Sequence, residues 1–327
     1  MNHDPLRRAL LGAVPALLAA PAITPASAQT SDRPLRLVIP FAPGGTSDIL
    51  ARLLAPELTR LLGVNVVVEN RSGAAGNLGA ELVARAAPDG TTLLLTDVGA
   101  LAIAPALFTR LGFDPVADLA PVNLLIYAPY ILAVHPSVPA RDAAALVALA
   151  KARPDSINVA HSGVGAANHL TALVLAQHWG AGLTQVPYRG GAAALSAVAG
   201  GEAQLIVNGA TATAPFARDG RLRAIAVSGP RRLEDLPDVP TFAELGWPAT
   251  ESGTWQGVLT ASATPPAAIE RLDAAFRAVL AQPEMARRMA GLGAEVRAMG
   301  PAPFRAWLAA EVTQWGRVVR ANDLRVE

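Results

Sequence analysis

Short runs rich in branched apolar residues alternate with longer segments of helical periodicity along most of this chain. The runs 35–39, 64–68 and 92–95 have the composition of buried strands. The segments 47–62 and 76–87 lie between them and carry apolar residues at helical spacing. Strands that are joined by helices normally pair in the same direction, because the helix carries the chain back to the starting edge. The alternation therefore predicts a parallel sheet with helices on both faces.

The same alternation returns in the middle of the chain and ends in helices. Strands are predicted at 130–134, 157–160, 183–186, 204–207 and 223–227, and helices at 141–152, 168–178 and 192–199. Pro265 and Pro266 favour the first turn of a helix that reaches Leu280. A last helix is predicted at 304–321. Five large apolar residues lie along one of its sides and are expected in the core: Phe304, Trp307, Leu308, Val312 and Trp315.

Composition removes several classes of function. Charged residues make up 16% of the chain, the formal net charge is +1, and like charges form no block, so nucleic-acid binding is not expected. The absence of cysteine excludes disulfides, thiolate metal sites and a cysteine nucleophile. The five histidines show no ligand spacing. We therefore expect neither a metal site nor a cofactor.

The first 28 residues have the order of a secretory signal. Arg7 and Arg8 precede an apolar run over 9–23, and the small residues 26–28 follow, so cleavage is expected near Ala28. The apolar run is short for a membrane span, although an uncleaved anchor is the alternative. The arginine pair also resembles a twin-arginine signal, while such pairs occur in general secretion signals too. Either route predicts an exported, periplasmic protein that begins near Gln29.

Several loops that enter predicted helices are rich in glycine and small polar residues. The loops 40–48, 160–169 and 187–191 each follow a predicted strand, where ligands bind in open parallel sheets. Glycines let the backbone approach a ligand, and the free N–H groups of a helix start attract an anion without any basic side chain. Ordinary helix capping by Ser47 or Asp48, and a solvated Arg189, are the alternative explanations. The stretch 71–77 also enters a helix and is interpreted as a structural loop.

Motifs of well-known enzymes are missing. The sequence has no Gly-x-Ser-x-Gly elbow, no Walker A loop and no His-Glu-x-x-His motif. Gly163 and Gly165 lack the third glycine of a dinucleotide fingerprint. Ser162 and His169 share one loop, which leaves a hydrolase open as a minor alternative. No catalytic residue is predicted.

Taken in order, five long motifs resemble the Bug family, the periplasmic substrate-binding proteins of tripartite tricarboxylate transporters. They are RLVIPFAPGG at 36–45, VVVENRSGAAGN at 66–77, PDGTTLL at 88–94, VPYRGG at 186–191 and LPDVPT at 236–241. The resemblance extends from about residue 34 to residue 324. One glycine loop is weak evidence, whereas this many motifs in the same order are specific.

This resemblance implies an α/β fold of two domains, a type II-like periplasmic binding protein clamshell in which each domain is a mostly parallel sheet with helices on both faces. Residues 29–129 and 252–327 would form the first domain and residues 130–251 the second, joined by two crossing strands that act as a hinge. The ligand would lie in the cleft between the domains, and closure would trap it.

By the same resemblance, a small carboxylate is bound mainly through loop N–H groups and ordered water. One wall of the predicted site comprises Gly44, Gly45, Thr46, Ser47 and Asp48. The other comprises Ser162, Gly163, Gly165, Asn168, His169, Tyr188, Arg189, Gly190 and Asn208. Phe41, Thr96 and Asp97 complete the predicted set of ligand-binding residues.

Three departures from the family pattern bear on the ligand. Residues 96–101 read TDVGAL where a hydroxyl-rich turn is frequent, so donors are lost and Asp97 adds a negative charge near the cleft. Ala166 and Ala167 stand where Ser or Thr is common, and Asn208 replaces a frequent acidic residue. Fewer donors and more methyl groups predict a ligand less charged than citrate, such as a monocarboxylate with an apolar or aromatic body.

The sequence thus predicts a monomeric periplasmic receptor that is not an enzyme. It would capture a small organic acid and deliver it to a membrane permease with large and small subunits. A periplasmic sensor that binds the same kind of ligand and acts on a membrane kinase is the main alternative. A hydrolase that uses Ser162 and His169 is a further one.

Overall fold

The computed structural model describes residues 33–247, 253–321 and 324–325, which belong to one unit, Asp32–Glu327. The predicted signal peptide at 1–28 lies outside the described residues. Within the described part, no helix combines the length and the apolar character needed to cross a membrane.

The N-terminal strands form a parallel group. Strand β1 (Leu35–Ile39) lies between β2 (Val66–Asn70) and β3 (Thr92–Asp97), and both pairings are parallel. Leu37 pairs with Val68 on one side and with Leu93 on the other. These strands confirm the prediction from the apolar runs, although β2 and β3 each end two residues later than expected.

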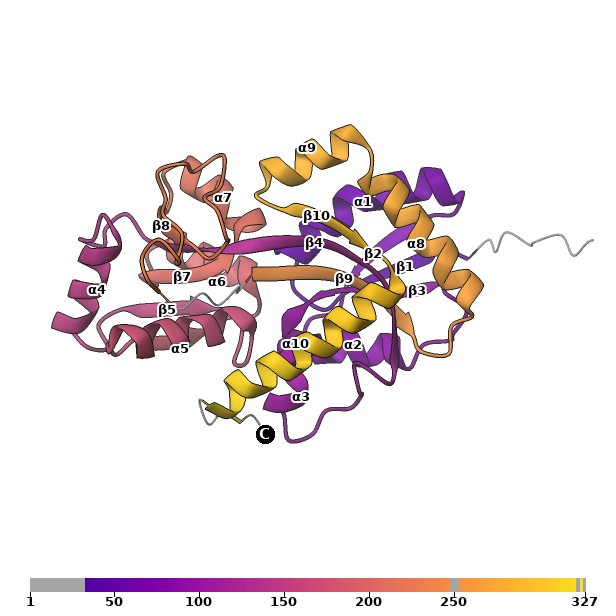
Figure 1. The fold of residues 1–327 in the computed structure, drawn as a ribbon, viewed down its shortest axis with the longest axis horizontal. Coiled ribbons are helices and arrows are strands. Elements are labelled where there is room, and N and C mark those ends of the chain that lie inside the picture. The colour runs from indigo at the N-terminus through magenta and orange to yellow at the C-terminus, as the bar shows by residue number, and fades with distance from the viewer. Residues whose placement is uncertain (1–32, 248–252, 322–323, 326–327) are drawn as a thin grey trace, which may run out of the picture. The chain divides into compact units, whose positions relative to one another are not determined.

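Two long strands connect this group to the rest of the sheet. Strand β4 (Leu119–Val134) pairs antiparallel with β9 (Gly253–Ala261), which in turn pairs antiparallel with β3. The two strands lie side by side through the middle of Figure 1. Strand β9 was not predicted from the sequence, and only the last five residues of β4 were predicted as a strand. Pro121 and Pro129 interrupt the strand pattern of β4. The register with β9 shifts directly after Pro121, and Pro129 forms the last pair of β4 with β9.

The far half of β4 belongs to a second group of strands. It pairs antiparallel with β7 (Leu205–Gly209) and β8 (Arg223–Val227). Strand β5 (Asn158–His161) pairs parallel with β7 and with β6 (Thr184–Pro187), and β10 (Glu295–Met299) pairs antiparallel with the first half of β4. The α/β prediction is confirmed, but "mostly parallel" is wrong: every pairing made by β4 is antiparallel, so the sheet is mixed.

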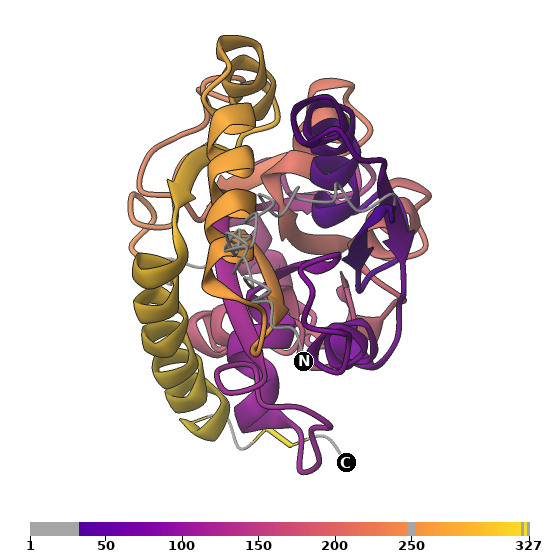
Figure 2. The ribbon, with the colours of Figure 1, turned by 90° about the vertical axis from the view of Figure 1, so that its right-hand side faces the viewer.

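Helices cover both faces of the strands. They are α1 (Thr46–Leu62), α2 (Asn77–Ala84), α3 (Ala104–Leu107), α4 (Ala143–Ala152), α5 (Ala167–Trp179), α6 (Gly191–Ala199), α7 (Ala210–Arg218), α8 (Pro266–Leu280), α9 (Pro283–Gly291) and α10 (Pro301–Ala321), with a 3-10 turn η1 (Ala74–Gly76) and a π-helical turn η2 (Gly99–Ile103). Figure 1 shows α1 and α8 on one side of the N-terminal strands and α2, α3 and α10 on the other. Figure 2 shows α8, α9 and α10, in orange and yellow, across from the indigo β1 and β2.

Buried apolar side chains fill both faces. Leu37, Leu50 and Phe276 belong to a cluster between the strands and α1 and α8. On the opposite face, Phe304 of α10 meets Trp255 of β9 edge-on, with ring centroids 5.7 Å apart. Phe304, Leu308 and Trp315 are buried, and Trp307 and Val312 are half-buried, so the predicted core side of the last helix is confirmed.

Candidate functional site

A small cavity of about 50 Å³ lies where several strands end and helices begin. The ends of β3 and β7 reach it through Asp97, Asn208 and Gly209. Its full lining is Phe41, Gly45, Thr46, Ser47, Ala75, Asp97, Gly99, Tyr130, Ser162, Ala166, Asn168, Gly191, Asn208, Gly209 and Thr254. This is the edge at which open α/β sheets bind ligands.

Four helices point their N-termini at this cavity. The residues that precede α1, α5, α6 and α7 are Gly45, Ala166, Gly190 and Gly209, and none provides a side-chain cap. The lining includes three of these residues together with Gly191, the first residue of α6. The first N–H groups of a helix have no partner within it, so uncapped starts leave donors available. Aspartate caps exist elsewhere in the chain: Asp142 accepts a bond from the N–H of Ala145 at the start of α4.

A buried amide orders two hydroxyl groups of the lining. Ser47 donates to Oε1 of Gln256 at 2.6 Å, and Nε2 of Gln256 donates to Oγ1 of Thr254 at 2.9 Å. Gln256 is fully buried. Because the hydrogen of Ser47 is used, this oxygen offers lone pairs, whereas the hydroxyl hydrogen of Thr254 remains available to donate.

On the opposite side of the lining, two asparagines are held by hydroxyl groups. Nδ2 of Asn168 donates to Oγ of Ser162 at 3.0 Å, and the backbone N–H of Ser162 donates back to Oδ1 of Asn168 at 3.3 Å. Nδ2 of Asn208 donates to Oγ1 of Thr213 at 3.1 Å. The side-chain oxygen of Asn208 therefore remains an acceptor near the cavity.

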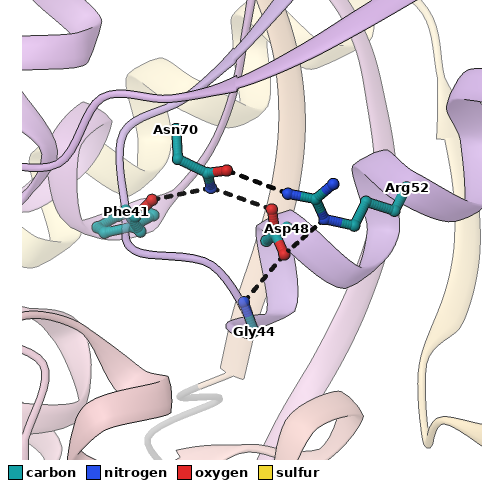
Figure 3. A network of polar contacts seen from close by, with 5 residues as sticks. All are labelled: Phe41, Gly44, Asp48, Arg52 and Asn70. Carbon is teal, nitrogen blue, oxygen red and sulfur yellow. Dashed lines mark hydrogen bonds and ion pairs between the residues drawn. The ribbon is translucent and has the colours of Figure 1, made fainter.

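Asp48 is not part of the lining. Figure 3 shows its polar contacts with the first loop and its neighbours. Its carboxylate accepts bonds from the N–H of Gly44 at 2.9 Å, from Nε of Arg52 at 3.0 Å and from Nδ2 of Asn70 at 3.0 Å. Asn70 also donates to the carbonyl of Phe41 at 3.1 Å. Burial alone raises the pKa of Asp48, but these hydrogen bonds outweigh it and the pKa is lowered. Asp48 is predicted from the sequence to contact the ligand; in the structure its carboxylate holds the first loop.

Asp97 is the acidic residue of the lining. It is half-buried, and its Oδ1 accepts the N–H of Gly99 at 2.9 Å. Desolvation raises the pKa of Asp97 to about 6. Tyr130 lines the same cavity, and its pKa is raised well above the ordinary value by burial and by the charge of Asp97. Lys, Arg and His are absent from the lining as the structure describes it.

A wider cavity of about 390 Å³ adjoins the first one. The two share Phe41, Ala75 and Ser162. The remaining walls are formed by Pro40, Ser72, Gly73, Ala74, Gly76, Gly163, Tyr188, Arg189 and Gly190. The stretch 71–77, interpreted from the sequence as a structural loop, thus contributes to the wall of both cavities.

His169 packs beneath the second loop. Its ring stacks on that of His161, with centroids 4.3 Å apart, and its Nδ1 accepts the N–H of Gly165 at 3.2 Å. Desolvation, with a contribution from His161, lowers the pKa of His169 to about 4. Ser162 is hydrogen-bonded to Asn168, so the two groups of the suggested hydrolase have different partners.

The predicted residues therefore fall into three groups. Phe41, Gly45, Thr46, Ser47, Asp97, Ser162, Asn168 and Asn208 line the small cavity, and Gly163, Tyr188, Arg189 and Gly190 line the wider one. Gly44, Asp48, Thr96, Gly165 and His169 line neither. Gly44 and Gly165 have φ of +87° and +82°, which glycine adopts without strain. A Cβ on Gly165 would also collide with Leu107, so both glycines allow the backbone conformation of their loops.

Reasoning from the sequence missed Ala75, Gly99, Tyr130, Ala166, Gly191, Gly209 and Thr254 as lining residues. Gly191 and Gly209 follow the same signal as the predicted glycines, since each begins or precedes a helix after a strand. Thr254 lies on β9, which the sequence analysis did not recognise as a strand.

Comparison with known proteins defines the class. The chain is 34% identical to the solved structure of the periplasmic binding protein BugD, with a TM-score of 0.87 over 90% of this chain and 99% of that one. MatC (Rpa3494) from Rhodopseudomonas palustris, solved with bound malate, is 33% identical, with a TM-score of 0.84 over 88% of this chain and 99% of that one. The fold is that of the two-domain periplasmic binding proteins, which are receptors and not enzymes.

The family follows from the sequence comparisons. Residues 50–324 match the model of the tripartite tricarboxylate transporter family receptor. Protein BugT of Bordetella pertussis (strain Tohama I / ATCC BAA-589 / NCTC 13251) is 33% identical over 305 residues, which cover 93% of this chain and 94% of that protein. The chain belongs to the tripartite tricarboxylate transporter receptor family, and the resemblance to the Bug proteins is confirmed. Members of this family are periplasmic solute-binding proteins.

Proposed function

We propose that this protein captures a monocarboxylate with an apolar or aromatic body and delivers it to a membrane permease with large and small subunits. The observation that carries the proposal is the set of four uncapped helix N-termini at one cavity. A carboxylate placed there receives backbone N–H donors and the positive ends of helix dipoles. No basic side chain is needed.

The lining favours a ligand with little charge. Phe41, Ala75 and Ala166 present carbon atoms to the cavity, and Ser47 has already given its hydrogen to Gln256. A second or third carboxylate would meet these carbon atoms or the carboxylate of Asp97, and a buried carboxylate without donors is costly. MatC, a relative, binds malate. A less charged ligand is proposed here because Asp97 is part of the lining and would repel a second carboxylate.

Export and capture are parts of the same proposal. Residues 1–28 would direct export, with cleavage near Ala28. Residues 29–129 with 252–327, and residues 130–251, would form two domains that close over the ligand. Strands β4 and β9 are the candidates for the hinge, because β4 pairs with strands of both groups. The ligand-loaded, closed form would be the one that the permease recognises.

The first test is a thermal-shift screen of the purified protein, emptied of co-purified ligand, against monocarboxylates, dicarboxylates, tricarboxylates and aromatic acids. A ligand that binds only the folded state stabilises it by mass action and so raises the melting temperature. At a ligand concentration of a hundred to a thousand times Kd, the stabilisation is about 3–4 kcal/mol. A shift with monocarboxylates supports the proposal. Tight binding of tricarboxylates without binding of aromatic acids would overturn the ligand class.

A pair of variants tests the backbone donors directly. Thr46→Pro removes the first N–H of α1, and proline is favoured at this position of a helix. Gly45 has φ −82° and ψ 173°, the extended conformation that a following proline requires. Thr46→Ala keeps the N–H and is the matched control. We expect Thr46→Pro to bind the identified carboxylate at least about tenfold more weakly than Thr46→Ala, in proportion to one lost charged hydrogen bond. Equal affinities would remove α1 from the site.

A further inference from the structure

Asp97 stands in an unusual position for a receptor of carboxylates. It is the last residue of β3 and lines the same small cavity as the four helix starts. Within the described residues its side chain forms no ion pair, and no cation contributes to its pKa. A carboxylate without a cation, placed where a ligand carboxylate is attracted, sets up a repulsion that a simple organic acid cannot relieve.

The local backbone holds this side chain in place. Oδ1 accepts the N–H of Gly99 two residues ahead, as in an Asx turn. A Cβ on Gly99 would lie 3.1 Å from Oδ1, so a glycine suits this close turn. Among the described residues, no other residue donates a hydrogen bond to Oδ2. One carboxylate oxygen is therefore fixed by the chain, and the other is free to accept from a ligand.

The surroundings do not neutralise the charge. Asp97 and Tyr130 are the titratable side chains of the lining, and Tyr130 is a neutral phenol at ordinary pH. Burial raises the pKa of Asp97 to about 6, which leaves the residue mainly ionised at neutral pH but costly to keep so. A positively charged group beside Asp97 would relieve this cost. The chain described by the structure provides none.

We propose that Asp97 selects ligands that carry a protonated amine next to their carboxylate, so that the receptor takes small zwitterionic amino acids in preference to plain organic acids. This inference rests on the proposed function, because the carboxylate of the same ligand would occupy the helix N-termini. The cavity is small, which brings Asp97 and the helix starts close together and favours a short separation between amine and carboxylate. Asp97 thereby also disfavours dicarboxylates and tricarboxylates by repulsion.

The test compares ligands that differ by the amine alone. Leucine and 4-methylpentanoate form one pair, phenylalanine and 3-phenylpropanoate a second, and aspartate and succinate a third. Calorimetry or thermal shift at pH 8 gives the affinity ratio within each pair. We expect the amine-bearing member of at least one pair to bind the unmodified protein about tenfold or more tightly than its partner. Asp97→Asn should reduce this ratio to near one, mainly by weakening the amine-bearing member.

A matched control separates local from general charge effects. Asp89→Asn changes the net charge by the same amount. Asp89 lies in the turn before β3, where its carboxylate accepts the N–H of Thr91 and pairs with Arg33. The variant should leave the affinity ratio unchanged. Asp97→Glu is a second variant, which keeps the negative charge. The affinity ratios of the unmodified protein test the proposal even where a variant fails to fold.

The outcomes separate the two proposals. Binding of the plain acids as tightly as, or more tightly than, their amine-bearing partners would overturn the role of Asp97 and leave the monocarboxylate receptor standing. An unchanged ratio in Asp97→Asn would do the same. Failure of every probe to bind the folded, emptied protein would overturn both proposals.

Discussion

Two aspartates near the cavity have the same side chain and opposite surroundings. Asp48 accepts three hydrogen bonds, from the N–H of Gly44 and the side chains of Arg52 and Asn70, and its pKa is lowered. Asp97 accepts one hydrogen bond, from the N–H of Gly99, and its pKa is raised to about 6. The first residue is buried and is not part of the lining, whereas the second is part of it.

The difference separates a structural role from a proposed ligand-binding one. A buried carboxylate whose partners belong to its own chain stabilises the fold and has little capacity left for a ligand. A buried carboxylate with one partner costs stability until something else pairs with it. Titratable groups with such shifted pKa values gather at functional sites.

The largest effect is expected at Asp48. Asp48→Ala leaves the N–H of Gly44 and the amide of Asn70 without their acceptor and releases Arg52, so the free energy of unfolding should fall by about 2–3 kcal/mol. Urea denaturation at pH 7 measures this change. Arg60→Ala removes an exposed ion pair on the same helix and should leave the stability nearly unchanged. A loss no greater than that of Arg60→Ala would mean that Asp48 does not anchor the loop.

The opposite sign is expected at Asp97 in the ligand-free protein. Its pKa is higher in the folded state than in the unfolded one, so the folded state loses stability as the pH rises from about 4 to about 6. Asp97→Asn should therefore stabilise the protein at pH 8, by about 1–2 kcal/mol after allowance for the face open to the cavity. At pH 4 the gain should shrink to a few tenths. Urea denaturation at both pH values checks this, and a destabilised variant at pH 8 would show that Asp97 is already paired.

The sequence predicts that Asp97 lies near a cleft, but it does not predict the contacts that Asp48 makes within its own loop. The glycine loops and the family motifs place 40–48 and Asp97 near a cleft, because loops after parallel strands gather at one edge of the sheet. They do not reveal that Asp48 turns back to Gly44 and Asn70. Side chains 22 residues apart in the chain meet there, and such a contact has no local signal.

The fold shows the same limit. Strands β1 and β3 and helix α1 carry their periodicity within one segment, and the sequence analysis found them. Strand β9 was missed because Thr254, Gln256 and Gly257 interrupt its apolar run, although it is buried along its whole length. Without β9, the lining residue Thr254 and the antiparallel centre of the sheet could not be predicted. Helix α7 was not predicted either, because it contains Pro215, and a proline normally indicates the end of a helix.

The smallest effect is expected at His169, which, like Asp97 and unlike Asp48, has no charged partner among the described residues. Desolvation lowers its pKa to about 4, with a further contribution from His161, so the folded state keeps it neutral while the unfolded chain binds a proton below pH 6.5. Stability should therefore fall as the pH drops, by about 1 kcal/mol between pH 6.5 and 5.5 from this residue.

His169→Asn retains an acceptor close to Nδ1 for the N–H of Gly165 and cannot titrate. The variant should lose that acid-dependent part, as urea denaturation across the pH range would measure. His135→Asn, at a turn near Ser137, is the matched control for the loss of a histidine outside the stacked pair. If His169→Asn and the unmodified protein lose stability in parallel, the ring of His169 is hydrated in the folded state. The contrast between paired and unpaired buried groups would then be confined to the two aspartates.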